Sequence, residues 1–399
     1  MDHNNKYLFE IDFDYIDYDY AKNYFATTSS ADIAGACTVF KKNNIYARNY
    51  DFHYSQDADF IVRVPRIGDR YASVGMGYKK GLKASDVYNH LYTEEQIKLI
   101  PFITVDGINE NGVAVNVNVV PASDNSQAGV AVGEGEEVYN TMIVRYILDH
   151  ATSASNAVTL LSNIKILPTK PILDMGYEYH WMIADSSKAY IVEIYDGELK
   201  IIESNIMTNF FINTLTIDLT QYNLPTPYSH SQLEGAAPSS VGLGLASSGV
   251  ERYNVVRANL SNVDTINSAV TLMRNLKYSL LYTTLIAEDI PATMEHYWFS
   301  DFAHEAHKEG SSEYLDIDSL VSEYMASSEF NTIRAMGTAA FENKNRDLEV
   351  KPWQTVHTAV YDLTNKTITI ESQEGREDPE GSNKLYTVYL NQPDPNELL

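Results

Sequence analysis

The feature that most constrains this chain is a series of β-hairpin patterns. Runs of β-branched and aromatic residues flank polar turns at residues 38–50 and again at residues 356–370. Residues 113–119 alternate between valine or alanine and asparagine after the Asn111-Gly112 turn, and residues 190–202 flank an Asp-Gly pair. Such alternation around tight turns is typical of antiparallel sheets. It argues against a doubly wound parallel sheet.

Helical patterns lie between these strands. Residues 138–151 carry an apolar stripe at helical spacing, and Ser153 or Ser155 could cap a second helix that runs to residue 161. Strand-rich ends around a helical middle predict an α+β fold with one domain, residues 37–399, after a leader of residues 1–36. Further strands are predicted at residues 59–64, 70–74 and 386–390.

The charge of the chain limits its partners. A net charge of −25 over 399 residues repels nucleic acid and anionic membranes. The sequence has no apolar run of 18 residues, so it predicts no transmembrane helix. The leader lacks the basic and apolar regions of a signal peptide. We therefore expect a cytoplasmic protein, or a secreted or periplasmic one from which a signal has been removed.

The single cysteine, Cys37, stands where a run of small and polar residues, 27–36, meets the first predicted strand. A lone cysteine is most often a small buried apolar residue. If the chain were cut before Cys37, however, the new α-amino group, with an ordinary pKa of about 7.7–8.0, could take the thiol proton. Arg48 could then favour the thiolate from across the hairpin, and Asp51 could hold the amine. The alternative is a surface hairpin with an ordinary ion pair.

Two segments, residues 36–40 (ACTVF) and 47–52 (ARNYDF), resemble the opening of the choloylglycine hydrolase family. This family of linear-amide C–N hydrolases includes penicillin V acylases and conjugated bile salt hydrolases. Further similar motifs follow in the family's order at residues 106–112, 179–185, 191–193, 207–209, 247–257 and 360–363. Each motif is weak alone, but their shared order makes the resemblance specific.

The resemblance implies an αββα sandwich, two antiparallel sheets between helical layers, that cleaves amides through an acyl-enzyme on an N-terminal cysteine. By this similarity Cys37 is nucleophile and, through its amine, base, while Arg48 and Asp51 tune and orient it. Asn209 is expected to donate to the oxyanion, and Arg252 to stabilise charge beside the nucleophile.

The second oxyanion position is less sharply defined by the resemblance. Ungapped alignment places Val119 there, but a valine cannot donate a hydrogen bond, so Asn118 is favoured, with Asn116 as its neighbour on the same face. Proximity to the motifs suggests substrate contacts for five aromatic residues: Phe52, His53, Tyr177, Tyr179 and Trp181.

The sequence thus predicts an amidohydrolase for a small N-acyl substrate: a penicillin V-like amide, a conjugated bile acid, or an N-acyl amine or amino acid. Autocatalytic cleavage between Ala36 and Cys37 is expected. The alternatives are an acyltransferase with an amine acceptor, or an unprocessed, non-catalytic binding or scaffold protein. No metal or organic cofactor is expected, because the cysteine and its amine supply the chemistry. His304 and His307 are spaced i, i+3, which suits an exposed helix face better than a zinc motif. The resemblance also suggests a homo-oligomer, since relatives often form tetramers.

Overall fold

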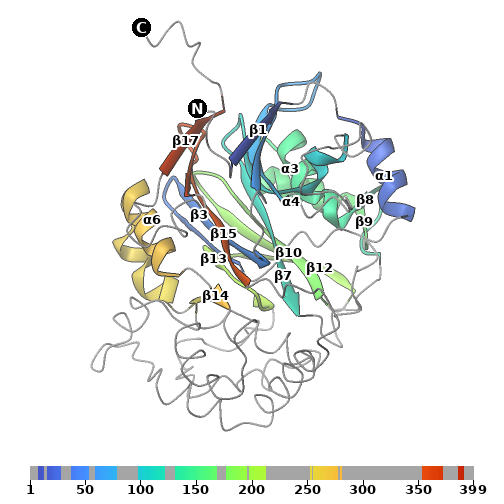
Figure 1. The fold of residues 1–399 in the computed structure, drawn as a ribbon. Helices are drawn as coiled ribbons and strands as arrows, with labels where there is room; N and C mark the ends of the chain where they lie inside the picture. The colour runs from blue at the N-terminus through green and yellow to red at the C-terminus, as the bar shows by residue number, and fades with distance from the viewer. Residues whose placement is uncertain are drawn as a thin grey trace, which may run out of the picture.

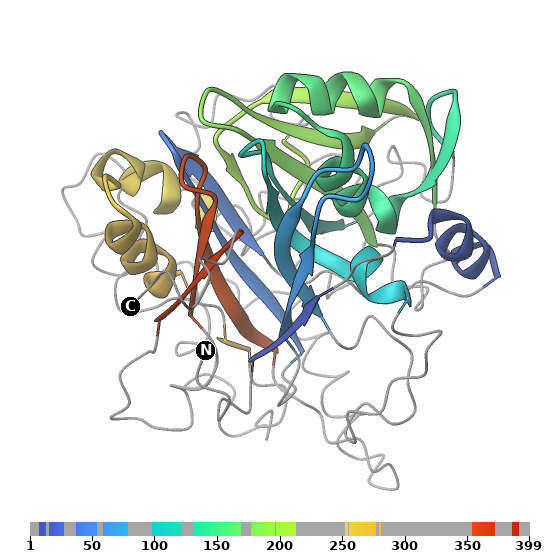
Figure 2. The ribbon, with the colours of Figure 1, turned by 90° about the horizontal axis from the view of Figure 1, so that it is seen from above.

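The predicted hairpins form two β-sheets that pack face to face (Figures 1 and 2). The computed structural model describes residues 8–12, 16–27, 37–53, 59–78, 98–121, 131–168, 177–195, 197–212, 252–253, 255–276, 279–280, 353–371 and 385–390. Within these residues the first sheet has, in order, β1 (Leu8–Asp12), β4 (Asp59–Val64), β5 (Ser73–Tyr78), β6 (Thr104–Asn109), β7 (Ala114–Pro121), β10 (Tyr177–Ala184), β11 (Ala189–Tyr195) and β12 (Glu198–Glu203). All its pairs are antiparallel except β1 with β4.

The second sheet contains the strand that follows Cys37. Its order is β13 (Ile206–Met207), β2 (Thr38–Lys42), β3 (Ile45–His53), β15 (Trp353–Asp362), β16 (Thr367–Glu371) and β17 (Leu385–Tyr389), with β14 (Ser279–Leu280) also paired to β15. A separate parallel pair joins β8 (Glu136–Tyr139) to β9 (Ile164–Leu167).

Helices cover the outer faces of the two sheets. Figure 2 shows α3 (Ile143–His150) and α4 (Ala154–Ser162) outside the first sheet, and α6 (Ile266–Asn275) outside the second. The described part of the chain also contains α1 (Tyr18–Thr27) and the short helices η3 (Ile100–Ile103), η4 (Asn140–Met142) and η8 (Leu260–Asn262). This arrangement confirms the predicted αββα sandwich. None of the helices in the described ranges is both long and apolar enough to cross a bilayer.

Local turn and cap chemistry explains several boundaries. Gly112 adopts φ 78°, and a Cβ there would meet the Leu363 carbonyl oxygen at 2.4 Å, so the turn before β7 requires glycine. The Ser153 side chain accepts a hydrogen bond from the Asn156 backbone N–H, so Ser153 caps α4 and Ser155 does not.

Two predicted boundaries were wrong because tertiary pairing overrode the local pattern. The helix expected from residue 138 begins only after Tyr139, because Val138 pairs with Ile166 in the β8–β9 ladder. The strand expected from Arg70 begins at Ser73, because Arg70 instead forms an isolated bridge with Ile67.

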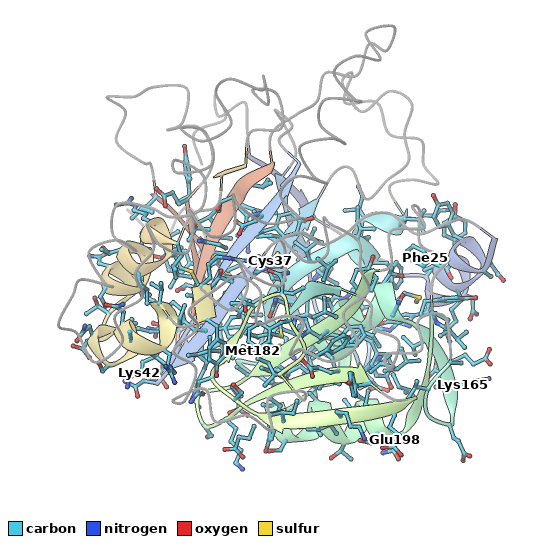
Figure 3. All side chains as sticks on the ribbon, turned by 90° about the horizontal axis from the view of Figure 1, so that it is seen from below. Phe25, Cys37, Lys42, Lys165, Met182 and Glu198 are labelled. Carbon is cyan, nitrogen blue, oxygen red and sulfur yellow. The ribbon has the colours of Figure 1, made fainter. Side chains whose placement is uncertain are left out.

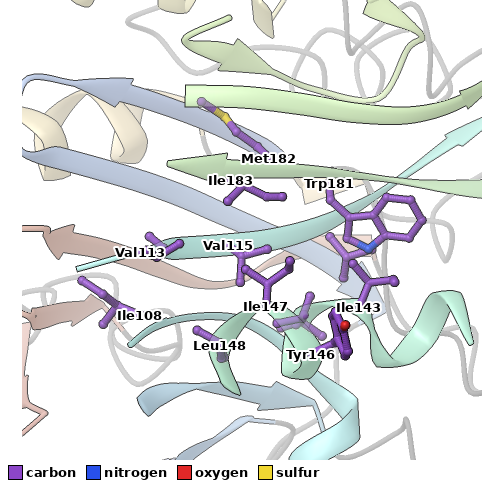
Figure 4. Close-up of a cluster of buried hydrophobic side chains, with 14 of the residues drawn as sticks. Ile108, Val113, Val115, Ile143, Tyr146, Ile147, Leu148, Trp181, Met182 and Ile183 are labelled. Carbon is purple, nitrogen blue, oxygen red and sulfur yellow. The ribbon is translucent and has the colours of Figure 1, made fainter. Parts of the chain in front are cut away.

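The two faces of β7 have different chemistry. Val115 packs with Ile143 and Ile147 of α3 in an apolar cluster (Figure 4). Asn116 and Asn118, on the opposite face, are fully buried between the two sheets. Buried polar side chains need partners, so the interior of the sandwich holds a hydrogen-bonded network. That network surrounds Cys37.

Candidate active site

Cys37 lies immediately before β2 and is fully buried (Figure 3). Its backbone N–H donates to Oδ1 of Asn209 at 2.7 Å. Its Sγ lies 3.5 Å from Nη2 of Arg48. The β2–β3 register pairs Val39 with Arg48, so Cys37, two residues before Val39, shares the face from which Arg48 points between the sheets.

Arg48 is held in one orientation by several acceptors. Besides the sulfur, Nη2 donates to the Val117 carbonyl oxygen at 2.6 Å. Nη1 donates to the Val105 carbonyl oxygen at 2.5 Å and forms an ion pair with Asp106. A fully buried guanidinium needs such partners. The network therefore places a fixed positive charge beside the cysteine sulfur.

The local electrostatics favour one protonation state of Cys37. Burial raises the pKa of the Cys37 thiol above its ordinary value, and the charge of Arg48 only partly opposes this effect. Burial alone would lower the pKa of Arg48, but the Cys37 sulfur and Asp106 together raise it. Burial therefore favours the neutral thiol of Cys37, beside a buried arginine that stays charged.

Asp106 belongs to the network around Arg48, although the sequence analysis did not single it out. His357 Nε2 lies 3.1 Å from Asp106 Oδ2, and the Tyr361 hydroxyl donates to Oδ1. Although burial opposes ionisation, Arg48, His357 and Tyr361 hold the pKa of Asp106 below its usual value. The signal in the sequence was its place as the first residue of the motif at residues 106–112.

Arg252 joins two other predicted residues, Asn209 and Asp51, at the nitrogen side of Cys37. Its Nη2 donates to Asn209 Oδ1 at 2.8 Å, and its Nη1 donates to Thr38 Oγ1 at 2.7 Å. Nη1 also lies 3.6 Å from the Asp51 carboxylate. Asn209 Oδ1 thus accepts from both the Cys37 backbone and Arg252. The structure brings Cys37, Arg48, Asp51, Asn209 and Arg252 together.

Asn118 is linked to Cys37 through Thr208 and Asn209, although its predicted role requires it beside the sulfur. Its Nδ2 donates to the Thr208 carbonyl oxygen at 3.2 Å, and its Oδ1 accepts from Asn116 Nδ2 at 2.7 Å. Val119 contributes its carbonyl oxygen, which accepts from Asn209 Nδ2 at 2.7 Å. Asn118 therefore supports the segment that carries Asn209.

A buried histidine–glutamate pair holds the same segment from β10 and β11. His180 Nε2 donates to the Thr208 carbonyl oxygen at 2.7 Å, and His180 Nδ1 lies 3.1 Å from Glu193 Oε1. Glu193 Oε1 also accepts from the Ile212 backbone N–H at 2.8 Å. His180 lies in the motif at residues 179–185 and Glu193 in the motif at residues 191–193, but the sequence assigned neither a role.

Two of the predicted substrate contacts, Trp181 and Tyr179, face away from the space between the sheets. Trp181 is fully buried on the helix-facing side of β10, with the cluster around α3 (Figure 4), opposite His180. Tyr179 alternates onto the same side and is half-buried. These two placements correct the prediction, because the alternation of β10 turns both side chains away from the inter-sheet space. The side chains of Phe52, His53 and Tyr177 lie outside the part of the chain that the structure describes.

His304, His307 and the motif serines at residues 247–248 also lie outside the described residues. Among the residues that are described, His, Cys, Asp and Glu side chains form no group of three suited to a metal ion.

A family model for linear amide C–N hydrolases, the choloylglycine hydrolase family, matches residues 36–250, more than half of the chain. The chain belongs to the choloylglycine hydrolase family. It is a hydrolase that acts on linear amides. The family match begins one residue before Cys37 and includes Arg48, Asp106 and Asn209, whereas Arg252 and His357 lie beyond its end.

Solved structures of a conjugated bile acid hydrolase and a penicillin V acylase are similar to this choloylglycine hydrolase family member. A variant of conjugated bile acid hydrolase from Clostridium perfringens is 16% identical with a TM-score of 0.49, and the match covers 90% of this chain and 94% of that one. Penicillin V acylase from Agrobacterium tumefaciens is 13% identical with a TM-score of 0.42, covering 89% and 86%. No curated protein sequence gives a significant match.

Proposed function

We propose that Cys37 is the nucleophile of this linear-amide hydrolase and that cleavage of the Ala36–Cys37 bond activates it. One observation carries the proposal: the Cys37 nitrogen is bound by Asn209 at 2.7 Å while Arg48 lies 3.5 Å from its sulfur. After cleavage that nitrogen would be a free amine beside the thiol, so one residue would supply both nucleophile and base. Residues 1–36 are the leader in this proposal.

Activation would be an N-to-S acyl shift. The Cys37 sulfur attacks the carbonyl carbon of Ala36, the C–N bond breaks, and the departing nitrogen takes the thiol proton to become the α-amine. Water then hydrolyses the thioester, which releases the leader carboxylate and restores the thiol. The attack is intramolecular, because the sulfur and the Ala36 carbonyl carbon belong to adjacent residues, and Arg48 beside the sulfur favours its ionisation.

Catalysis on the substrate would follow the same chemistry. The α-amine takes the thiol proton, the sulfur attacks the substrate carbonyl carbon, and the protonated amine returns the proton to the leaving nitrogen. Water then hydrolyses the acyl-enzyme to the free acid. We retain Asn209 as the oxyanion donor, a role whose loss typically reduces the rate about 10²–10³-fold. Asn118 would position the segment through the Thr208 carbonyl.

The substrate would be a small N-acyl amide. The net charge of −25 does not favour recruitment of an anionic conjugated bile acid. Neutral fatty-acyl amines are therefore preferred, whereas penicillin V-like amides and N-acyl amino acids carry a carboxylate and share the disadvantage of bile acid conjugates.

N-terminal sequencing and intact mass of the purified protein test this proposal. We expect a new terminus at Cys37 in the wild type and an uncut chain in Cys37→Ala, which lacks the sulfur. The same preparations are then assayed with phenoxyacetyl, fatty-acyl and bile acid amides. A wild-type chain that stays uncut yet hydrolyses these amides would overturn the mechanism.

A further inference from the structure

We propose that the leader remains bound after cleavage as a second chain of the mature enzyme, an inference that rests on the proposed function only for the cut itself. The sequence suggested a removable segment. In the structure, the described residues between Leu8 and Thr27 instead contribute a strand, a helix and several core side chains to the sandwich.

The first attachment is a strand pairing. β1 extends the edge of the first sheet by pairing in parallel with β4, in register from Leu8 with Asp59 to Asp12 with Arg63. Parallel pairing between segments far apart in the chain depends on their tertiary positions and not on a connecting turn. A break before Cys37 removes none of these backbone hydrogen bonds.

The second attachment is apolar. Ile16, Ala21 and Phe25 are 4%, 0% and 2% exposed and belong to the main core cluster. The Phe25 ring lies 6.3 Å from the ring of Tyr139, next to η4. Loss of the leader would expose these packing partners to water. Because burial of apolar side chains is favourable, dissociation of the leader is strongly opposed.

The third attachment is a polar one to a buried ion pair in α3. The Tyr18 hydroxyl donates to Asp149 Oδ2 at 2.8 Å, while Asp149 Oδ1 pairs with Arg145 at 2.6 Å. Arg145 also donates to Ser73 Oγ at 2.6 Å. The side chains of Arg145 and Asp149 are 1% and 0% exposed, so the leader tyrosine completes a fully enclosed pair.

Arg70 binds the chain at the start of the leader helix α1. Its Nη1 donates to the Ile16 carbonyl oxygen at 2.8 Å, and its guanidinium lies over the Tyr18 ring, 4.7 Å from the centroid. The Tyr18 ring also packs against the Phe102 ring, with the centroids 5.1 Å apart and the ring planes at 86°. Phe102 belongs to η3, which runs directly into β6, the strand of Asp106. The leader therefore supports elements that carry the site.

A test that does not depend on autoprocessing uses an engineered cut. A specific protease recognition sequence replaces part of residues 28–35 in Cys37→Ala, and the purified full chain is cut with that protease. We expect denaturing mass spectrometry to show two fragments and native mass spectrometry to show one complex. Release of the leader fragment, with the larger fragment still folded by circular dichroism, would overturn the proposal.

Matched variants show which contacts hold the fragment. In the cut protein, we expect Phe25→Ala to speed exchange with an isotopically labelled leader peptide by about a hundredfold or more, and Tyr18→Phe by about tenfold. Lys22→Ala, which breaks only the partly exposed pair with Glu136, is expected to change it by less than about fivefold. Equal exchange rates in all three would contradict the proposed attachment. The wild type, examined in parallel, separately reports whether natural cleavage occurs.

Discussion

Arg48 lies with Nη2 3.5 Å from the Cys37 sulfur and with Nη1 paired to the buried Asp106 carboxylate. Removing the guanidinium affects both contacts at once. We expect Arg48→Met to lose most amide hydrolysis, because no charge stabilises the thiolate. It should also lower the unfolding free energy by about 3–5 kcal/mol, because the buried Asp106 carboxylate loses its arginine partner. Denaturant unfolding and steady-state assays measure the two effects.

The double variant Arg48→Met/Asp106→Asn separates these effects. Neutralising Asp106 removes the uncompensated charge, so part of the lost stability should return, whereas hydrolysis should not. Recovery of hydrolysis together with stability would mean that Arg48 acts only through folding.

The ionisation of Asp106 makes the unfolding free energy depend on pH. Its folded-state pKa is lowered below the ordinary 3.8, so its ionised form stabilises the native state above that value, and this contribution disappears as pH falls through the folded pKa. We expect the difference in unfolding free energy between wild type and Asp106→Asn to be largest near neutral pH and to shrink below about pH 3.8. Urea unfolding across this range measures it. A constant difference would contradict the assigned ionisation.

The hairpins were predictable because their determinants are local. Asn43, at φ 51°, and Gly197, at φ 69°, occupy turn conformations that asparagine and glycine tolerate, and the flanking strands alternate accordingly. β1 and β8 were not predicted, because each is stabilised by parallel pairing with a strand distant in sequence. Local patterns contain no information about such partners.

The candidate site also contains residues that local sequence could place and residues that only the complete fold brings together. Arg48 could be placed beside Cys37 from the sequence because one hairpin register relates them. Asn209 and Arg252 were found only through family resemblance. Asp106 and His357 were missed as partners, since their contact spans 251 residues and joins the two sheets. The way one sheet faces the other depends on packing of the whole sandwich, which no short motif encodes.

His180 is expected to position the Asn209 segment without touching substrate. His180→Phe removes the Nε2 donor to the Thr208 carbonyl and leaves that buried acceptor with fewer partners, at a cost of about 1–3 kcal/mol in unfolding free energy. We expect kcat to fall while KM changes little, because Asn209 moves relative to the sulfur. Glu193→Gln, which keeps an oxygen acceptor for the Ile212 N–H, should have a smaller effect. A rise in KM alone would contradict this positioning role.

Two substitutions at Asn209 separate its possible contributions. Asn209→Asp keeps an oxygen for the Cys37 nitrogen and for Arg252 but removes the Nδ2 donor, which now binds the Val119 carbonyl. If Nδ2 serves the oxyanion, Asn209→Asp should cleave its leader yet lose about 10²–10³-fold in kcat. Asn209→Ala should impair both steps, because it also frees the Cys37 nitrogen. Intact mass reports cleavage and steady-state kinetics report turnover. Near-normal turnover in Asn209→Asp would assign Asn209 to holding the nitrogen and leave oxyanion stabilisation to another group.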